Sequence, residues 1–168
     1  MFTLFRVQPQ LRDARMYLEL VLGLTAMAKA KEFTVAIADK PGALGECFLA
    51  LAERGVNIRA FQSYVEERES LVRFLTDDVA TAKAVLATKN MIFEETDVAV
   101  VRLADRPGAL GRAARRLGEA HINIDYSYCG FDPGSPLALL VFGVDSLTKA
   151  ATLLDELAAE DREANADS

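Results

Sequence analysis

The sequence predicts an α+β protein made of two similar units, each with the order β-α-β-β-α-β and with its helices on one face of an antiparallel sheet. Two observations support this prediction. The phrase ADKPGALG, which begins at Ala38, returns as ADRPGALG at Ala104. The same offset of 66 positions continues without gaps and pairs Asn57-Ile58 with Asn123-Ile124. An internal repeat indicates the unit of structure, and two copies suit two small domains rather than a solenoid.

The composition is that of an ordinary globular protein and excludes several function classes. The chain has 168 residues, of which 51% are hydrophobic and 26% charged, and its formal net charge is -6. This acidic balance disfavours nucleic-acid binding. Cys47 and Cys129 lack a CxxC spacing, and with the single His121 they are too few for a zinc site, so we expect no metal and no cofactor. No Ser/His/Asp set or phosphate loop is visible, so we do not expect an enzyme.

Residues 1–31 are expected to form an N-terminal extension. Glu19 interrupts a short apolar run, and no segment approaches the roughly 20 apolar residues of a membrane span, so we expect a cytoplasmic protein without a membrane partner. A signal peptide that ends near Ala26 and Ala28 is one alternative. Translation from Met27 is another, because the two copies begin to match only near Phe33.

The first unit is expected to span residues 32–96. Bulky and small residues alternate over 33–37, which predicts a strand with one face on a core. Gly55 suits the left-handed residue that ends a helix. The predicted first helix carries its apolar stripe at Leu44, Cys47, Phe48 and Leu51. The strands IRAFQSYV and SLVRFLT follow, then a helix from about 78 to 89 and the strand MIFEE.

The second unit is expected to span residues 97–158 and repeats this pattern. The strand AVVRLA precedes a helix, the strands IDYSYCGF and LALLVFGV are joined by a DPGS turn, and a second helix follows. The two helices carry the stripes Leu110, Ala113, Ala114, Leu117 and Leu147, Ala150, Ala151, Leu154. Residues 159–168 form a polar tail, which is unsuited to a buried strand. The second sheet therefore lacks its last strand unless another segment, such as MFTLFRV, supplies it.

The doubled motif resembles the ACT domain. Its elements are a strand, D-[KR]-P-G-A-L at the start of a helix, and then [GH]-[VI]-N-I, and the resemblance covers about Phe33 to Leu157. It implies ferredoxin-like modules that bind amino acids and regulate metabolic enzymes. The chain is most similar to free-standing double-ACT proteins and to small regulatory subunits of acetolactate synthase.

The resemblance also implies ligand sites where the first strand–helix loop meets the start of the second strand, often against a partner domain. Free N–H groups at the helix start suit a carboxylate, the aspartate suits an ammonium group, and the asparagine amide suits either. A glycine lets the ligand approach the backbone. The implied residues are Asp39, Gly42, Ala43, Leu44, Asn57 and Ile58 in the first unit, and Asp105, Gly108, Ala109, Leu110, Asn123 and Ile124 in the second.

Each of these residues also has a purely structural interpretation. Asp39 can cap its helix or fix the turn, Gly42 can allow close packing of helix and sheet, and Asn57 can tie down the chain as it leaves the helix. One of the two sites can be structural only. The basic cluster of Arg102, Arg106, Arg112, Arg115 and Arg116 is interpreted as a solvated helix face, with docking onto an acidic partner as the alternative.

The predicted function is that of a non-catalytic, amino-acid-binding regulatory protein. It would act through self-association, as a homodimer or larger, or through a biosynthetic enzyme partner. The alternative is a protein-interaction module or regulatory subunit, acetolactate-synthase-like or repressor-like, without a functional ligand site. The sequence does not indicate which amino acid binds.

Overall fold

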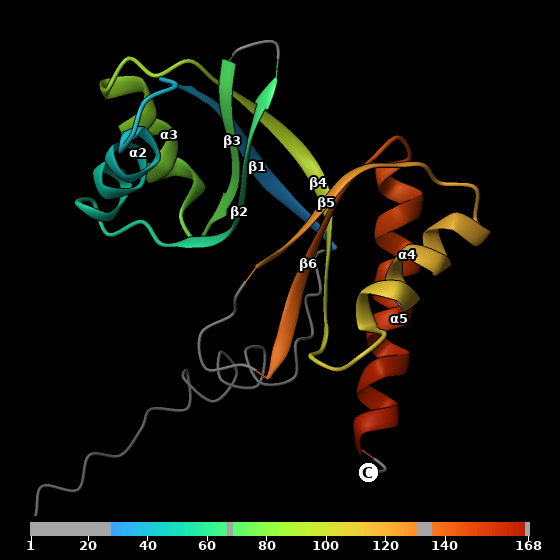
Figure 1. Ribbon diagram of the computed structural model, residues 1–168. Helices are drawn as coiled ribbons and strands as arrows, with labels where there is room; N and C mark the ends of the chain where they lie inside the picture. The colour runs from blue at the N-terminus through green and yellow to red at the C-terminus, as the bar shows by residue number, and fades with distance from the viewer. Residues whose placement is uncertain (1–27, 67–68, 131–135, 167–168) are drawn as a thin grey trace, which may run out of the picture.

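The computed structural model describes residues 28–66, 69–130 and 136–166. This part of the chain forms an α+β structure with six antiparallel strands and four helices (Figure 1). The strands are β1 (Lys29–Ile37), β2 (Ile58–Glu66), β3 (Glu69–Thr76), β4 (Phe93–Ala104), β5 (Ile124–Gly130) and β6 (Leu137–Val144). The helices are α2 (Ala43–Ala52), α3 (Val79–Thr88), α4 (Ala109–Glu119) and α5 (Leu147–Ala166).

The strands close into one barrel in the order β1-β3-β2-β5-β6-β4, rather than forming two separate sheets. The 12-residue strand β4 joins the two halves, because its first part pairs with β1 and its last part with β6. Phe33 lies opposite Glu95 in the first pairing, and Val101 lies opposite Leu140 in the second. Figure 1 shows α2 and α3 outside one side of the barrel, and α4 and α5 outside the other.

The first residues of β1 pair with β4, at the edge that a fourth strand of the second half would otherwise cover. Lys29 lies opposite Ala99, and the Val100 N–H donates to the Ala28 carbonyl at 2.9 Å. Residues 29–31, which we expected in the N-terminal extension, therefore belong to β1. The segment MFTLFRV, considered above as the donor of this strand, lies outside the described residues. Met27, the alternative start of translation, also lies outside them.

The seam between β2 and β5 is the weakest junction of the barrel. In the described residues these strands share one register pair, Ala60 with Gly130, whereas every other neighbouring pair shares six or more. A Cβ on Gly130 would lie 2.3 Å from both the Ala60 Cβ and the Arg59 carbonyl oxygen. Only glycine allows this approach of the two backbones.

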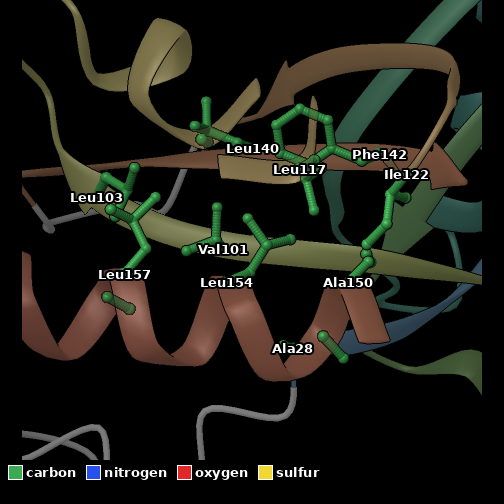
Figure 2. Close-up of a cluster of buried hydrophobic side chains, with 14 of the residues drawn as sticks. Ala28, Val101, Leu103, Leu117, Ile122, Leu140, Phe142, Ala150, Leu154 and Leu157 are labelled. Atoms are coloured by element: carbon green, nitrogen blue, oxygen red, sulfur yellow. The ribbon is translucent and has the colours of Figure 1, made fainter. Parts of the chain in front are cut away.

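Three apolar clusters stabilise the fold. Because successive strand residues face opposite sides, Phe33 and Val35 point to α2 and α3, while Glu32 points into the barrel. The outer cluster of the second half is shown in Figure 2 and includes Leu103, Leu117, Leu140, Phe142 and Leu154. The barrel interior holds Ala60, Leu75, Val98, Val100, Tyr128, Leu139 and Val141. The helix stripes expected from the sequence contribute Cys47, Leu51, Ala113, Leu117, Ala150, Ala151 and Leu154 to these clusters.

Helix α5 continues through the segment that we expected to be a polar tail. It runs to Ala166, because Leu157, Ala158 and Asp161 on its inner face are all buried against the second half. The end of α2 agrees with expectation, since Gly55 has a φ of 75°, and His121 takes the same left-handed conformation at the matching position with a φ of 57°. None of the described helices has the length and apolar character needed to cross a bilayer.

Candidate functional site

A pocket of about 250 Å³ opens between the β1–α2 loop and the neighbouring strands β2 and β3. Its lining residues include one with a carboxylate, one with an ammonium group and two with hydroxyls, together with apolar residues. The lining residues are Ile37, Ala38, Asp39, Lys40, Gly42, Ala43, Leu44, Ser63, Tyr64, Val65, Ser70 and Leu71. Four of the six residues proposed for the first unit, Asp39, Gly42, Ala43 and Leu44, are among them.

The glycine before each first helix is required by the backbone conformation. Gly42 has a φ of 91° and Gly108 a φ of 92°, a region in which a side chain is strained. A Cβ at either position would meet no atom within 4 Å, so these glycines do not serve close packing of helix and sheet. The turn directs the start of α2 toward the pocket.

Asp39 neither caps α2 nor stands alone at the mouth of the pocket. Its Oδ1 accepts a hydrogen bond from the Ser70 hydroxyl at 3.0 Å, which connects the loop to the start of β3. The residue remains exposed, so its carboxylate is open to solvent. The Ala43 N–H, expected to be free, donates to the Lys40 carbonyl at 3.3 Å. The N–H groups of Gly42 and Leu44 are therefore the donors of this turn that we expect to meet a ligand carboxylate.

Asn57 and Ile58 lie at the far end of β2 from this pocket. The pocket contacts β2 at Ser63–Val65, and five residues of strand from Ile58 to Ser63 span about 17 Å. The Asn57 N–H donates to Asp77 Oδ1 at 2.8 Å, and the Asp77 N–H returns a bond to the Asn57 carbonyl at 3.2 Å. These bonds hold the chain as it leaves α2, so the structure does not bring Asn57 and Ile58 to Asp39 within one chain.

The matching loop of the second half has different surroundings. Position 136, the counterpart of Ser70, is a proline, and its carbonyl accepts the Asp105 N–H at 3.1 Å. Asn123 donates through its side chain to Asp125 at 2.8 Å and, with Ile124, lies at the start of β5. Ala109 and Leu110 begin α4, and the Ala109 N–H donates to the Arg106 carbonyl at 3.1 Å.

Asp161 on α5 organises the basic residues of the second half. Its Oδ2 accepts the Ala104 N–H at 2.8 Å, and its Oδ1 accepts from Arg106 at 2.8 Å and from Arg112 at 2.5 Å. Burial of Asp161 opposes its ionisation, but the Ala104 N–H and the two guanidinium groups outweigh this effect and hold its pKa below the ordinary value.

Other acidic residues pair with Arg115 and Arg116 of the predicted basic cluster. Arg115 bonds to Glu119 at 2.7 Å, and Arg116 bonds to Glu160 at 2.6 Å. Asp161 was not predicted as a site residue, because the composition of residues 159–168 is typical of a polar tail. The signal for it was a helical spacing: Leu154, Leu157 and Asp161 follow at intervals of three and four residues, on the face of α5 that packs against the second half.

A buried polar network crosses the barrel interior and joins the two halves. Glu32 on β1 is fully buried. Its carboxylate accepts hydrogen bonds of 2.6 Å from both Tyr126 and Tyr128 on β5, and a longer contact of 3.4 Å from Arg73 on β3. Burial raises the pKa values of both tyrosines, and the charge of Glu32 raises them further. The Arg73 guanidinium also lies 4.0 Å from the centre of the Tyr126 ring, a cation–π contact.

Tyr64 links this network to the pocket. It lines the pocket, and its hydroxyl accepts a hydrogen bond from Arg73 Nε at 2.8 Å. Alternation along β1 and β2 separates inner from outer faces, but it does not show that the inner faces of both halves meet. The network therefore could not be found from the sequence. Within the described residues, no group of three or more His, Cys, Asp or Glu side chains could hold a metal ion.

Comparison with solved structures shows similar folds at low identity. Protein BT0572 from Bacteroides thetaiotaomicron matches with a TM-score of 0.67 and 24% identity, covering 77% of this chain and 88% of that chain. The ligand-free regulatory subunit of aspartate kinase from Thermus thermophilus matches with a TM-score of 0.51 and 19% identity, covering 77% and 92%. A structure of aspartokinase alpha and beta subunits matches with a TM-score of 0.50 and 16% identity, also covering 77% and 92%.

At these identities the similarity concerns the fold alone. No protein-family model matches the chain, and no curated protein matches it.

Proposed function

We propose that this chain is a non-catalytic regulatory protein, built from two ACT-like units of ferredoxin-like order, that binds a free amino acid in the pocket beside Asp39. It acts through self-association or through a biosynthetic enzyme partner. The observation that carries this proposal is the pocket itself. An exposed carboxylate, the start of a helix and two serine hydroxyls surround a volume of about 250 Å³.

The groups of the pocket complement a zwitterion. The Asp39 carboxylate suits an ammonium group, and the Gly42 and Leu44 N–H groups, at the positive end of α2, suit a carboxylate. Charge-assisted hydrogen bonds of this kind contribute about 1.5–3 kcal/mol each. A few of them therefore account for an affinity in the micromolar to millimolar range, which suits a sensor of metabolite level.

The walls of the pocket favour an apolar or aromatic side chain. The lining residues Ile37, Leu44 and Val65 offer apolar surface. Asn57 and Ile58, which do not reach the pocket of their own chain, complete the proposed site only if a partner supplies them. The resemblance to the ACT domain supports this function, as does the fold similarity to the regulatory subunit of aspartate kinase from Thermus thermophilus.

Self-association is proposed along β2. Beyond Ala60 this strand has no partner on its outer edge within the described residues, and unpaired strand edges in native proteins are usually covered. Phe61 and Val65 on the same strand are 46% and 64% exposed. A second copy that covers this edge would hide both side chains and lie beside the pocket. Light scattering over a range of concentrations tests this, and a monomer at high concentration would exclude it.

The ligand proposal is tested by a thermal-shift screen against the twenty amino acids. A ligand at 100 times its dissociation constant adds about 2.7 kcal/mol, which raises the melting temperature by several degrees. The shift should disappear in Asp39→Ala and persist in Asp105→Ala, the matched change in the second half.

One observation favours the alternative of an interaction module without a ligand site. Asp39 already bonds to Ser70, and the Ala43 N–H already bonds to Lys40, so two of the groups that the sequence assigned to a ligand are used within the chain. If no amino acid shifts the melting temperature, this alternative is preferred. A pull-down for enzyme partners is then the next experiment.

A further inference from the structure

We propose that the loop before α4 is closed by the chain's own Asp161, so that each chain offers one ligand site, the pocket beside Asp39. This inference rests on the proposed function for the ligand that it assigns to the first half. The closure of the second loop stands on contacts that involve no ligand.

Hydrogen-bond donors surround the Asp161 carboxylate. A backbone N–H and two guanidinium groups converge on one carboxylate, through the bonds from Ala104, Arg106 and Arg112. The Asp161 side chain is 4% exposed. Guanidinium groups and backbone N–H groups are the donors that proteins use for a free carboxylate, so the second half contains a carboxylate site that is filled from within.

The matching positions of the first half carry different residues and leave its pocket open. Arg106 and Arg112 correspond to Lys40 and Glu46 at the offset of 66 positions. These two residues pair with each other at 3.3 Å, with side chains 56% and 66% exposed, and leave the pocket open. In the second half, Arg106 and Arg112 instead donate hydrogen bonds to the buried Asp161.

Asp161 comes from a helix that is longer than its counterpart in the first half. Helix α3 has 10 residues and is followed by β4, whereas α5 has 20 residues and extends beyond the corresponding point. Asp161 lies in this extension. Because it belongs to the same chain, its effective concentration at the loop is high, and a free amino acid would have to displace it.

The wall of the second loop also differs from that of the pocket. Ser70, whose hydroxyl bonds to Asp39, corresponds to Pro136 in the second half. Proline offers no side-chain donor, and the Pro136 carbonyl already accepts the Asp105 N–H. The second loop therefore lacks the hydroxyl that Ser70 supplies in the first half.

The first experiment needs no amino acid. Asp161→Ala should lower the melting temperature by about 5–10 °C, because two arginines lose a buried partner. Glu160→Ala, which removes an exposed acid from the same turn, should lower it by about 2 °C or less. Sodium acetate, compared with sodium chloride at equal ionic strength, should raise the melting temperature of Asp161→Ala but not of the wild type or of the double variant Asp161→Ala with Arg112→Gln.

Absence of acetate rescue, or equal loss in Asp161→Ala and Glu160→Ala, overturns the closure. If Asp161→Ala does not fold, Asp161→Asn preserves the shape of the side chain. Amide hydrogen exchange at Ala104, whose N–H donates to Asp161, should then be faster in Asp161→Asn than in Glu160→Gln, because an amide oxygen accepts more weakly than a carboxylate. Equal exchange in the two variants overturns the proposal.

The second experiment counts sites by calorimetric titration with each of the twenty amino acids. One site per chain, lost in Asp39→Ala and retained in Asp105→Ala, is the expected result. Two sites per chain, or loss of binding in Asp105→Ala, overturns the inference and leaves the proposed function intact. If no amino acid binds, the proposed function fails, whereas the acetate experiment still decides whether Asp161 closes the second loop.

Discussion

The Tyr128 hydroxyl lies 2.6 Å from Oε1 of Glu32, a residue 96 positions earlier in the chain. This bond crosses the interior of the barrel and joins the first half to the second. Tyr126 makes an equally short bond to the same carboxylate. The β2–β5 seam has a single register pair among the described residues, so these bonds from β5 to Glu32 on β1 are a further connection between the two halves.

Removal of the Glu32 carboxylate should destabilise the protein. Glu32→Ala leaves one buried hydroxyl and one partly buried hydroxyl without their acceptor and Arg73 without its ion pair, at a cost of about 2–4 kcal/mol in the free energy of unfolding. Glu94→Ala, an exposed change on β4, should stay within about 0.5 kcal/mol of the wild type. Urea denaturation measures both values, and equal stabilities would show that the network contributes nothing.

Gly143 on β6 should not tolerate a methyl group. A Cβ at this position would lie 2.3 Å from the ring of Tyr126. We expect Gly143→Ala to cost about 1–3 kcal/mol by overpacking, and to cost less when Tyr126 is also changed to alanine. Gly111→Ala is the matched control, because this glycine lies in α4 with no atom near its Cβ position and alanine favours helix by about 1 kcal/mol.

The turn before α2 is tested in the same way by Gly42→Ala and Gly45→Ala. The positive φ of Gly42 makes alanine unfavourable there by about 1–2 kcal/mol, although no atom lies within 4 Å of the added Cβ. Gly45 lies in the first turn of α2 with equal space, so alanine should stabilise it. Thermal denaturation that ranks the two variants in the opposite order would contradict a strained turn at Gly42.

Stability should depend on pH through Asp161. Its pKa lies below the ordinary value in the folded protein, so its contribution is fully present above the unfolded pKa of about 3.9 and is lost as the pH falls through the lower folded pKa. The groups that face this carboxylate are Arg106, Arg112 and the uncharged Asn165.

The stability difference between the wild type and Asp161→Asn should therefore shrink as the pH falls below about 4. Urea denaturation from about pH 7 to about pH 3 measures this difference. A difference that stays constant over the range would show that folding does not lower the pKa of Asp161.

The sequence by itself determined the features that depend on neighbours along the chain. The repeat, the stripes of α2, α4 and α5 and the left-handed Gly55 all follow from local periodicity or from a single backbone conformation. The loop residues Asp39, Gly42, Ala43 and Leu44 were likewise identified from the motif, and they line the pocket.

Only the tertiary structure decided which surfaces meet. Alternation shows that Glu32 and Phe33 face opposite sides of β1, but not that the side of Glu32 closes onto β5 of the second half. The polarity of residues 159–168 likewise gave no indication that Asp161 would be buried. Its burial depends on donors 49 to 57 positions away in the chain. Such long-range pairings depend on how whole strands and helices pack, and local sequence patterns do not specify them.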